Sequence, residues 1–207
     1  EPSQAKSMKF GDKMAQISKF KMITGVSAIV LAALSPINHA VAAPDSIIEV
    51  YKQWNYQCQF ITAENQPAVT KNCEVVHHLN DSTGKRILSV AFTWKDDTAT
   101  PPNGVDQSGV IATLVTPPGV NLRVVPELVV ERLSELPIVW NAQYSTCVVS
   151  GCIADLMLNP SHVGTLSSGV GIQVRFGMVN VGPIAELNLP VDGLEEALEA
   201  LIRDDAN

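Results

Sequence analysis

Two of the four cysteines, Cys147 and Cys152, lie close together and are the residues of this chain best suited to chemistry. They enclose Val-Val-Ser-Gly, a spacing that could belong to a zinc site, a redox-active dithiol or a structural disulfide. Zinc needs four ligands, and the nearby His77 and His78 would point to opposite faces of a strand. A catalytic dithiol is typically Cys-x-x-Cys at the start of a helix, and neither feature is present. We therefore predict a structural disulfide and no metal site, with a thiol oxidoreductase as an alternative.

Nucleophilic hydrolysis is the other chemistry that the residue types allow. His162, Asp155 and Ser167 could act as the base, the orienting carboxylate and the nucleophile. The serine lies in Gly-Thr-Leu-Ser-Ser-Gly, which is not the Gly-x-Ser-x-Gly of a nucleophile elbow. We predict no catalytic residue and no cofactor, and we keep an exported hydrolase using these three residues as an alternative. It requires the three side chains to converge within hydrogen-bond reach.

The elements that must position these residues are mostly strands. Apolar and polar residues alternate with period two in several stretches, as is typical of half-buried strands: 88–94, 120–124, 172–176 and 185–189. Residues 110–116 are apolar on both faces and suit a central strand. The sequence therefore predicts a chain built largely from short strands.

Two stretches have helical character instead. Residues 192–202 place their leucines and alanines on one stripe, with Asp192 as the predicted N-cap and Glu195 completing a capping pair. A weaker helix is predicted over residues 161–166, after Pro160. Together these elements predict an all-β fold, mainly an antiparallel sandwich or barrel, with a short C-terminal helix.

The N-terminal segment has the pattern of a targeting signal. Lys19 and Lys21 precede a mostly apolar run from Met22 to Leu34, and an Ala-x-Ala site ends at Ala42. This pattern is typical of a secretory signal peptide. The apolar run is shorter than the roughly 20 residues of a membrane-spanning helix. We expect cleavage near Ala42, no stable transmembrane segment afterwards, and a protein that is periplasmic, on the outer surface or secreted.

All four cysteines follow this cleavage site. In an exported chain an even number of cysteines indicates disulfides. Three pairings are possible, and we expect the local one, Cys58–Cys73 with Cys147–Cys152. No linker or repeat divides the mature chain, so we predict an N-terminal extension and signal peptide over 1–42 and a single domain over 43–207.

Composition excludes some classes of partner. Apolar residues make up 46% of the 207 residues and charged residues 17%, which is enough apolar material for a real core. The formal net charge of −7 argues against binding nucleic acid through bulk electrostatics.

An ordered set of short motifs covers nearly the whole mature chain: Trp54-x3-Cys58, Cys73, Arg86-Ile-Leu-Ser-Val90, Pro118-Gly-Val-x-Leu122, Cys147-x3-Gly-Cys-x-Ala154, Leu166-x2-Gly169 and Leu189-x3-Gly-Leu-x2-Ala-Leu198. In this set the chain resembles the invasion-associated locus B (IalB) family, small exported proteins of Gram-negative bacteria. The resemblance implies a β-sandwich-like protein associated with entry into host cells, and it brings no catalytic residues with it. We therefore expect a non-enzymatic binding or accessory protein of the bacterial envelope, linked to virulence. Its expected partner is a protein or a component of the envelope or host surface, and its oligomeric state is left open.

Overall fold

The structure, a computed structural model, describes residues 46–62, 69–95, 108–179 and 184–205. By its internal contacts the chain divides into two units, residues 1–41 and residues 42–207. Every described residue belongs to the second unit. The signal peptide and its cleavage site at Ala42 lie outside the described residues, so both stay predictions.

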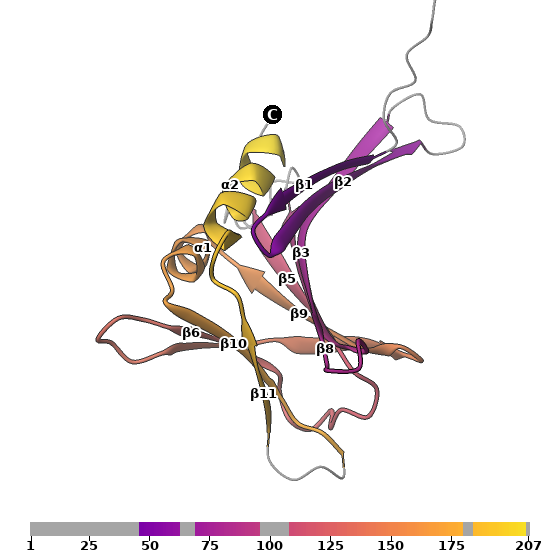
Figure 1. The fold of residues 1–207 in the computed structure, drawn as a ribbon, viewed down its shortest axis with the longest axis vertical. Coiled ribbons are helices and arrows are strands. Elements are labelled where there is room, and N and C mark those ends of the chain that lie inside the picture. The colour runs from indigo at the N-terminus through magenta and orange to yellow at the C-terminus, as the bar shows by residue number, and fades with distance from the viewer. Residues whose placement is uncertain (1–45, 63–68, 96–107, 180–183, 206–207) are drawn as a thin grey trace, which may run out of the picture. The chain divides into compact units, whose positions relative to one another are not determined.

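Seven antiparallel strands form the larger of two sheets, in the order β1-β2-β3-β4-β5-β9-β8 (Figure 1). Five of them follow each other along the chain as neighbours, and β9 then pairs with β5 and carries β8 on its other side. The strands are β1 (Ser46–Tyr51), β2 (Trp54–Thr62), β3 (Val69–Asn80), β4 (Arg86–Lys95), β5 (Gly109–Thr116), β8 (Gln143–Val148) and β9 (Gly151–Leu158).

The smaller sheet has four antiparallel strands in the order β11-β10-β6-β7. These are β6 (Glu127–Glu131), β7 (Ile138–Asn141), β10 (Gly171–Phe176) and β11 (Ala185–Leu189). A single residue, Ala142, separates β7 from β8, and its N–H donates to the carbonyl oxygen of Pro126 at 2.8 Å. The extended stretch 138–148 therefore passes from one sheet to the other. Its first part, β7, is an edge strand of the smaller sheet, and its second part, β8, is an edge strand of the larger sheet.

Two short helices, α1 (Pro160–Ser167) and α2 (Leu194–Asp205), accompany the sheets. Helix α2 packs along β1 to β4, and α1 packs on β5 and β9 (Figure 1). The side chain of Asn159 caps α1 by accepting a hydrogen bond from the His162 N–H at 2.9 Å. The helix predicted over 161–166 is thus confirmed.

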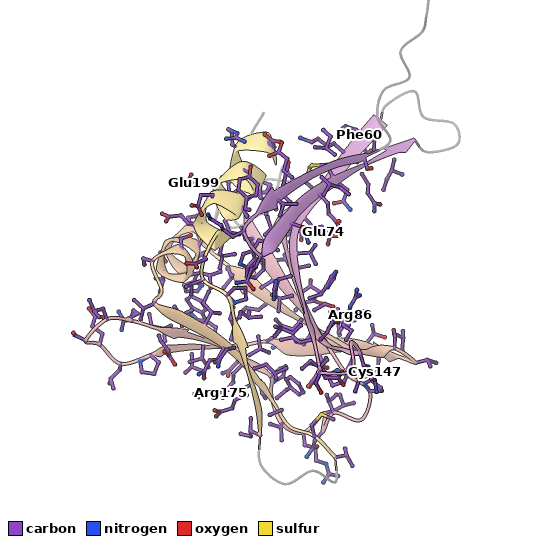
Figure 2. The ribbon with its side chains drawn as sticks, in the orientation of Figure 1. Phe60, Glu74, Arg86, Cys147, Arg175 and Glu199 are labelled. Atoms are coloured by element: carbon purple, nitrogen blue, oxygen red, sulfur yellow. A yellow bond between two sulfur atoms is a disulfide. The ribbon has the colours of Figure 1, made fainter. Side chains whose placement is uncertain are left out.

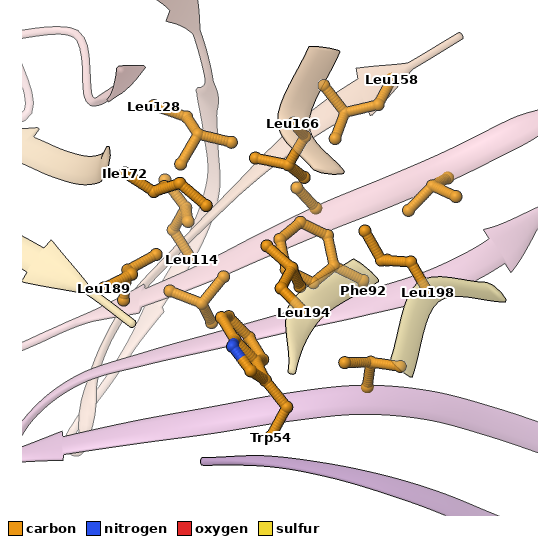
Figure 3. Packing of buried hydrophobic residues seen from close by; sticks show 14 of the residues in the cluster. Trp54, Phe92, Leu114, Leu128, Leu158, Leu166, Ile172, Leu189, Leu194 and Leu198 are labelled. Atoms are coloured by element: carbon orange, nitrogen blue, oxygen red, sulfur yellow. The ribbon is translucent and has the colours of Figure 1, made fainter. Parts of the chain in front are cut away.

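The core gathers side chains from both sheets and both helices. Trp54 of β2 and Phe92 of β4 stand in ring contact at 5.7 Å and are fully buried. Leu194 and Leu198 of α2 pack over them, while Leu128 of β6 comes from the other sheet (Figure 3). We call the side of the larger sheet that carries these residues its core face, and the opposite side its outer face.

The predicted capping of α2 by Asp192 is wrong in its details. Gly193 directly precedes the helix with a φ of +85°, and its carbonyl accepts the first helical bond, from Ala197 at 3.2 Å. A Cβ at this position would collide with the carbonyl oxygen of Tyr51 at the end of β1. Glycine is needed here because the helix starts pressed against a backbone, in a conformation that other residues rarely adopt.

The expected fold class is confirmed: the chain is mostly antiparallel sheet with two short helices, one of them C-terminal. In the described residues the two sheets remain open and do not close into a barrel. The strand predicted over 120–124 is wrong. Only Val120 forms a bridge, to Met178, and residues 122–124 make a turn in which the N–H of Val124 donates to Asn121.

A search of the described residues for membrane-spanning helices found none of sufficient length and apolar character.

Candidate functional site

The three residues of the alternative hydrolase do not come together. Asp155 lies on β9 and accepts a hydrogen bond from the hydroxyl of Thr113 on β5, at 2.9 Å. The buried residues of β9 alternate with it, so its carboxylate belongs to the outer face of the sheet. His162 and Ser167 belong to α1, whose Val163 and Leu166 are packed into the core on the other face.

The side chain of His162 packs against an aromatic residue instead. Its ring lies 5.0 Å from the ring of Trp140, and its Nδ1 atom is buried without a hydrogen-bond partner. Among the described residues no hydrogen bond joins any two of His162, Asp155 and Ser167. The geometric requirement of that alternative is therefore not met.

All four cysteines are in disulfides, paired Cys58–Cys73 and Cys147–Cys152, the local pairing that we expected. Each bridge joins residues directly opposite one another on neighbouring antiparallel strands. The first is buried in the core, whereas Cys147 is exposed on the edge strand β8. The two bridges thus differ in their access to solvent.

The turn of the second bridge requires a glycine. Gly151 has a φ of +150°, and a Cβ there would collide with the carbonyl oxygen of Thr116 on β5. Because β9 enters the sheet at this point, any side chain would push it away from β5 and disturb the partner of Cys147. The Gly-Cys pair of the motif is explained by this close backbone approach.

The two adjacent histidines point to opposite faces of β3, as the period of a strand dictates. His77 is buried on the core face, with its Nδ1 at 2.7 Å from the carbonyl oxygen of Gln53. His78 is exposed on the outer face, with its Nδ1 at 3.0 Å from the Ser89 hydroxyl. Partial burial and the nearby Arg86 lower the pKa of His78. Within the described ranges, no three potential metal ligands gather at one place.

Of the aromatic residues Trp54, Tyr56 and Trp140, most serve the core. Trp54 and Tyr56 are buried, and only Trp140 is partly exposed. The Tyr56 hydroxyl donates to the carboxylate of Asp204 on α2 at 2.7 Å, and Lys71 lies 3.4 Å from the same oxygen. This cluster ties the end of α2 to β2 and β3, and sequence reasoning missed it because its members are far apart in the chain.

One surface feature has the character of a binding site. Between Glu135 and Asp155 the chain has no charged residue, a run that includes all of β7 and β8. Strand β8 ends the larger sheet, pairs with β9 on one side, and in the described residues has no strand on its other side. Cys147, labelled in Figure 2, lies on this strand. We call β8 and its turn, residues 143–150, the neutral edge.

Apolar side chains on the neutral edge are open to solvent. Val148 is 54% exposed and Val149, at the tip of the turn, is 98% exposed. Unpaired strand edges usually carry charges or prolines that discourage further pairing. Here the protection is a single irregularity at Ser145, where the register between β8 and β9 shifts.

A hollow of about 530 Å³ opens beside the start of the neutral edge. Its lining combines apolar side chains with two amides and a phenol: Leu122, Val125, Pro126, Asn141, Ala142, Gln143 and Tyr144. Leu122 is 57% exposed and Val125 52% exposed, although both are apolar. Two further hollows, of about 270 and 260 Å³, are half this size.

Tyr144 links the hollow to the core. It pairs with the buried Ala154 on the core face of the sheet and packs against the core cluster. Burial raises the pKa of its phenol, and the nearby Thr116 hydroxyl offsets part of this effect. Tyr144 is therefore held in place by the packed core, whereas Leu122 comes from the turn that was wrongly predicted as a strand and Val125 directly follows that turn.

The sequence carried one signal for this site that reasoning from motifs did not use. A run of 19 uncharged residues, Leu136 to Ala154, stands out in a chain with 17% charged residues. The run alone does not show that β8 is an edge strand, since that depends on β9 pairing with β5.

Comparisons with known proteins found a matching family profile and a similar solved structure. Residues 54–202 match a family profile described as invasion associated locus B (IalB) protein. The fold is similar to a crystal structure of invasion associated protein b from Bartonella henselae, with a TM-score of 0.60 and 20% identity. That match covers 77% of this chain and 97% of the other. Among curated protein sequences, none matches.

Proposed function

Since the chain belongs to the invasion associated locus B family, we propose that it is an exported accessory protein of the bacterial envelope that acts by binding. The proposal makes it a disulfide-stapled binding protein without catalysis of its own. Its partner is a protein or a component of the envelope or of a host surface. A role in host-cell entry is proposed from the description of the family.

The observation that carries the proposal is the neutral edge with its hollow. A monomeric soluble protein seldom leaves apolar side chains clustered around an unpaired strand unless a partner covers them. Leu122 and Val125 line the hollow at the start of β8, Val148 lies at the end of this strand, and each of the three is more than half exposed. By contrast, the residues that could have formed a hydrolase are divided between two faces of the sheet.

Export is supported by the sequence pattern before Ala42 and by the cysteines. Disulfides form and persist in oxidising compartments such as the periplasm and the cell surface. The two disulfides of this fold support export to such a compartment. We accordingly propose that the protein is periplasmic, on the outer surface or secreted, after cleavage near Ala42.

Partner capture from envelope extracts tests the proposal. The purified protein is immobilised and compared with two matched variants, Leu122→Gln in the hollow and Leu133→Gln in the β6–β7 turn. Leu133 is 80% exposed, so both changes replace an exposed turn leucine by the same polar residue at little cost to folding. We expect wild type and Leu133→Gln to retain the same envelope component and Leu122→Gln to lose most of it. Failure of all three proteins to retain any component, together with turnover of a substrate, would contradict the proposal.

A further inference from the structure

We propose that the neutral edge binds an extended, apolar segment of a partner protein, which adds an eighth strand to the larger sheet. The inference rests on the proposed function and deepens it by naming the chemistry of the partner. It follows from the backbone of β8, from the lack of charge along it and from the hollow beside it.

The backbone identifies the partner as a polypeptide. In an antiparallel sheet, alternate residues of an edge strand direct their N–H and C=O groups away from the neighbouring strand. β8 has β9 on one side, and the described residues place no strand on the other. In the free protein these outward groups are open to water, and an extended polypeptide segment can replace that water by strand addition.

The four sheet edges are not equivalent. At the other end of the larger sheet β1 carries Glu49, and in the smaller sheet β11 carries Glu186. Strand β7 has only four residues and follows Pro137. β8 has neither a charge nor a proline, and beyond its irregularity at Ser145 it continues regularly through Thr146–Val148. By charge and proline content it is the edge least protected against pairing.

The hollow identifies the side chains of the partner segment. It opens next to Gln143 and Tyr144, so a side chain of the added strand on the core side would face Leu122 and Val125. Leu122 and Val125, both apolar and more than half exposed, favour an apolar side chain at that position. A second copy of β8 fits less well, since Gln143, Ser145 and Thr146 are polar. Acidic segments are disfavoured by the net charge of −7.

The first test uses a synthetic peptide with alternating threonine and valine, seven residues long, with blocked ends and one flanking lysine at each end. A control peptide of the same sequence has N-methyl groups on alternate backbone nitrogens along one edge. We expect the plain peptide to shift the amide signals of residues 143–148 in the NMR spectrum of the labelled protein. The N-methylated peptide should bind at least about tenfold more weakly, because it lacks the hydrogen bonds of one edge.

Two variants of the protein locate the binding. Thr146→Lys places a charge on the neutral edge at an exposed position, and Leu133→Lys places the same charge on the β6–β7 turn. We expect Thr146→Lys to weaken binding of the plain peptide about tenfold or more, and Leu133→Lys to leave it unchanged. Unaltered far-ultraviolet circular dichroism and an unchanged unfolding midpoint show that each variant is folded.

Three outcomes would overturn the inference. One is a peptide that fails to bind or shifts signals away from β8, and another is equal binding of the plain and N-methylated peptides. The third is a chain that sediments as a dimer and becomes monomeric with Thr146→Lys, since a second copy then occupies the edge. If any of these occurs, retention of an envelope component by wild type but not by Leu122→Gln would still support the proposed function. Failure of the strand-addition inference can thus be distinguished from failure of the proposed function.

Discussion

Gly151 shows how one residue of a family motif is dictated by backbone geometry. It holds a positive φ, and it also lies where a Cβ would meet the carbonyl of Thr116. Gly84, in the turn between β3 and β4, also has a positive φ, of +83°, but there is open space where its Cβ would lie. Substitution of Gly84 therefore carries a conformational cost alone, whereas substitution of Gly151, with its φ of +150°, carries a conformational cost and a backbone collision.

We predict that Gly151→Ala destabilises the protein far more than Gly84→Ala. The conformational cost at Gly84 is about 1–2 kcal/mol. At Gly151 the displaced strand adds about 2 kcal/mol or more. Urea unfolding of both variants measures the difference in the free energy of unfolding. Equal losses would show that the close approach of Gly151 to β5 is wrong.

Asp204 is a second residue whose role depends on geometry. The Tyr56 hydroxyl, with help from Lys71, holds the pKa of this carboxyl below its ordinary value, despite the opposing effect of burial. A lowered pKa in the folded state means that the charged form stabilises the fold above the ordinary pKa. That stabilisation is lost as the pH falls below about 4 and through the folded pKa.

We predict that Tyr56→Phe costs about 1–2 kcal/mol at neutral pH, because a hydrogen bond to a charged group is removed. The difference from wild type should shrink progressively below about pH 4, as Asp204 becomes protonated. Urea unfolding between pH 7 and pH 2.5 measures it, with Asp192→Asn as a control at an exposed carboxylate. A difference that stays constant over this range would contradict the role given to Asp204.

At the scale of elements, each of the two disulfides links neighbouring antiparallel strands, but one is buried and the other is partly exposed. Both close pairs of antiparallel strands, with sequence separations of 15 and 5 residues. The bridge on β2 and β3 is buried beneath α2, next to the Tyr56 hydroxyl at 3.3 Å from Cys73 Sγ. The bridge on β8 and β9 lies at the sheet edge.

We predict that mild reductant opens Cys147–Cys152 before Cys58–Cys73. Thiol–disulfide exchange requires access of the attacking thiolate to a sulfur atom, and only the second bridge has an exposed cysteine. Alkylation at increasing reductant concentration, followed by peptide mass spectrometry, gives the order. Simultaneous labelling of all four cysteines would show that both bridges are equally accessible or that the fold opens as a whole.

Alternation of apolar and polar residues predicts some strands of this fold correctly and one wrongly. The alternation in residues 88–94 and 172–176 predicts β4 and β10 correctly, because each strand has one face in the core. The same alternation in 120–124 falls in a turn held by backbone hydrogen bonds. A short Val-x-Leu-x-Val run fits a strand or a turn equally well, and the packing around Val120 decides between them.

At the scale of the whole molecule, the site depends on strand order, which no local pattern contains. The uncharged run is visible in the sequence, but its exposure follows from β9 pairing with β5 and leaving β8 outermost. The hollow likewise forms because 121–126 and 141–144, separate in sequence, meet beside this edge. For this reason the disulfides could be predicted from the sequence and the candidate binding site could not.

Binding through the neutral edge is the central claim, and photo-cross-linking in the living bacterium tests it most directly. A photoreactive phenylalanine analogue replaces Gln143 at the hollow or, as a control, Leu133 in the β6–β7 turn. We predict a discrete cross-linked protein adduct from position 143, its loss when Thr146→Lys is added, and no such adduct from position 133. Adducts from position 133 with none from 143 would contradict the claim.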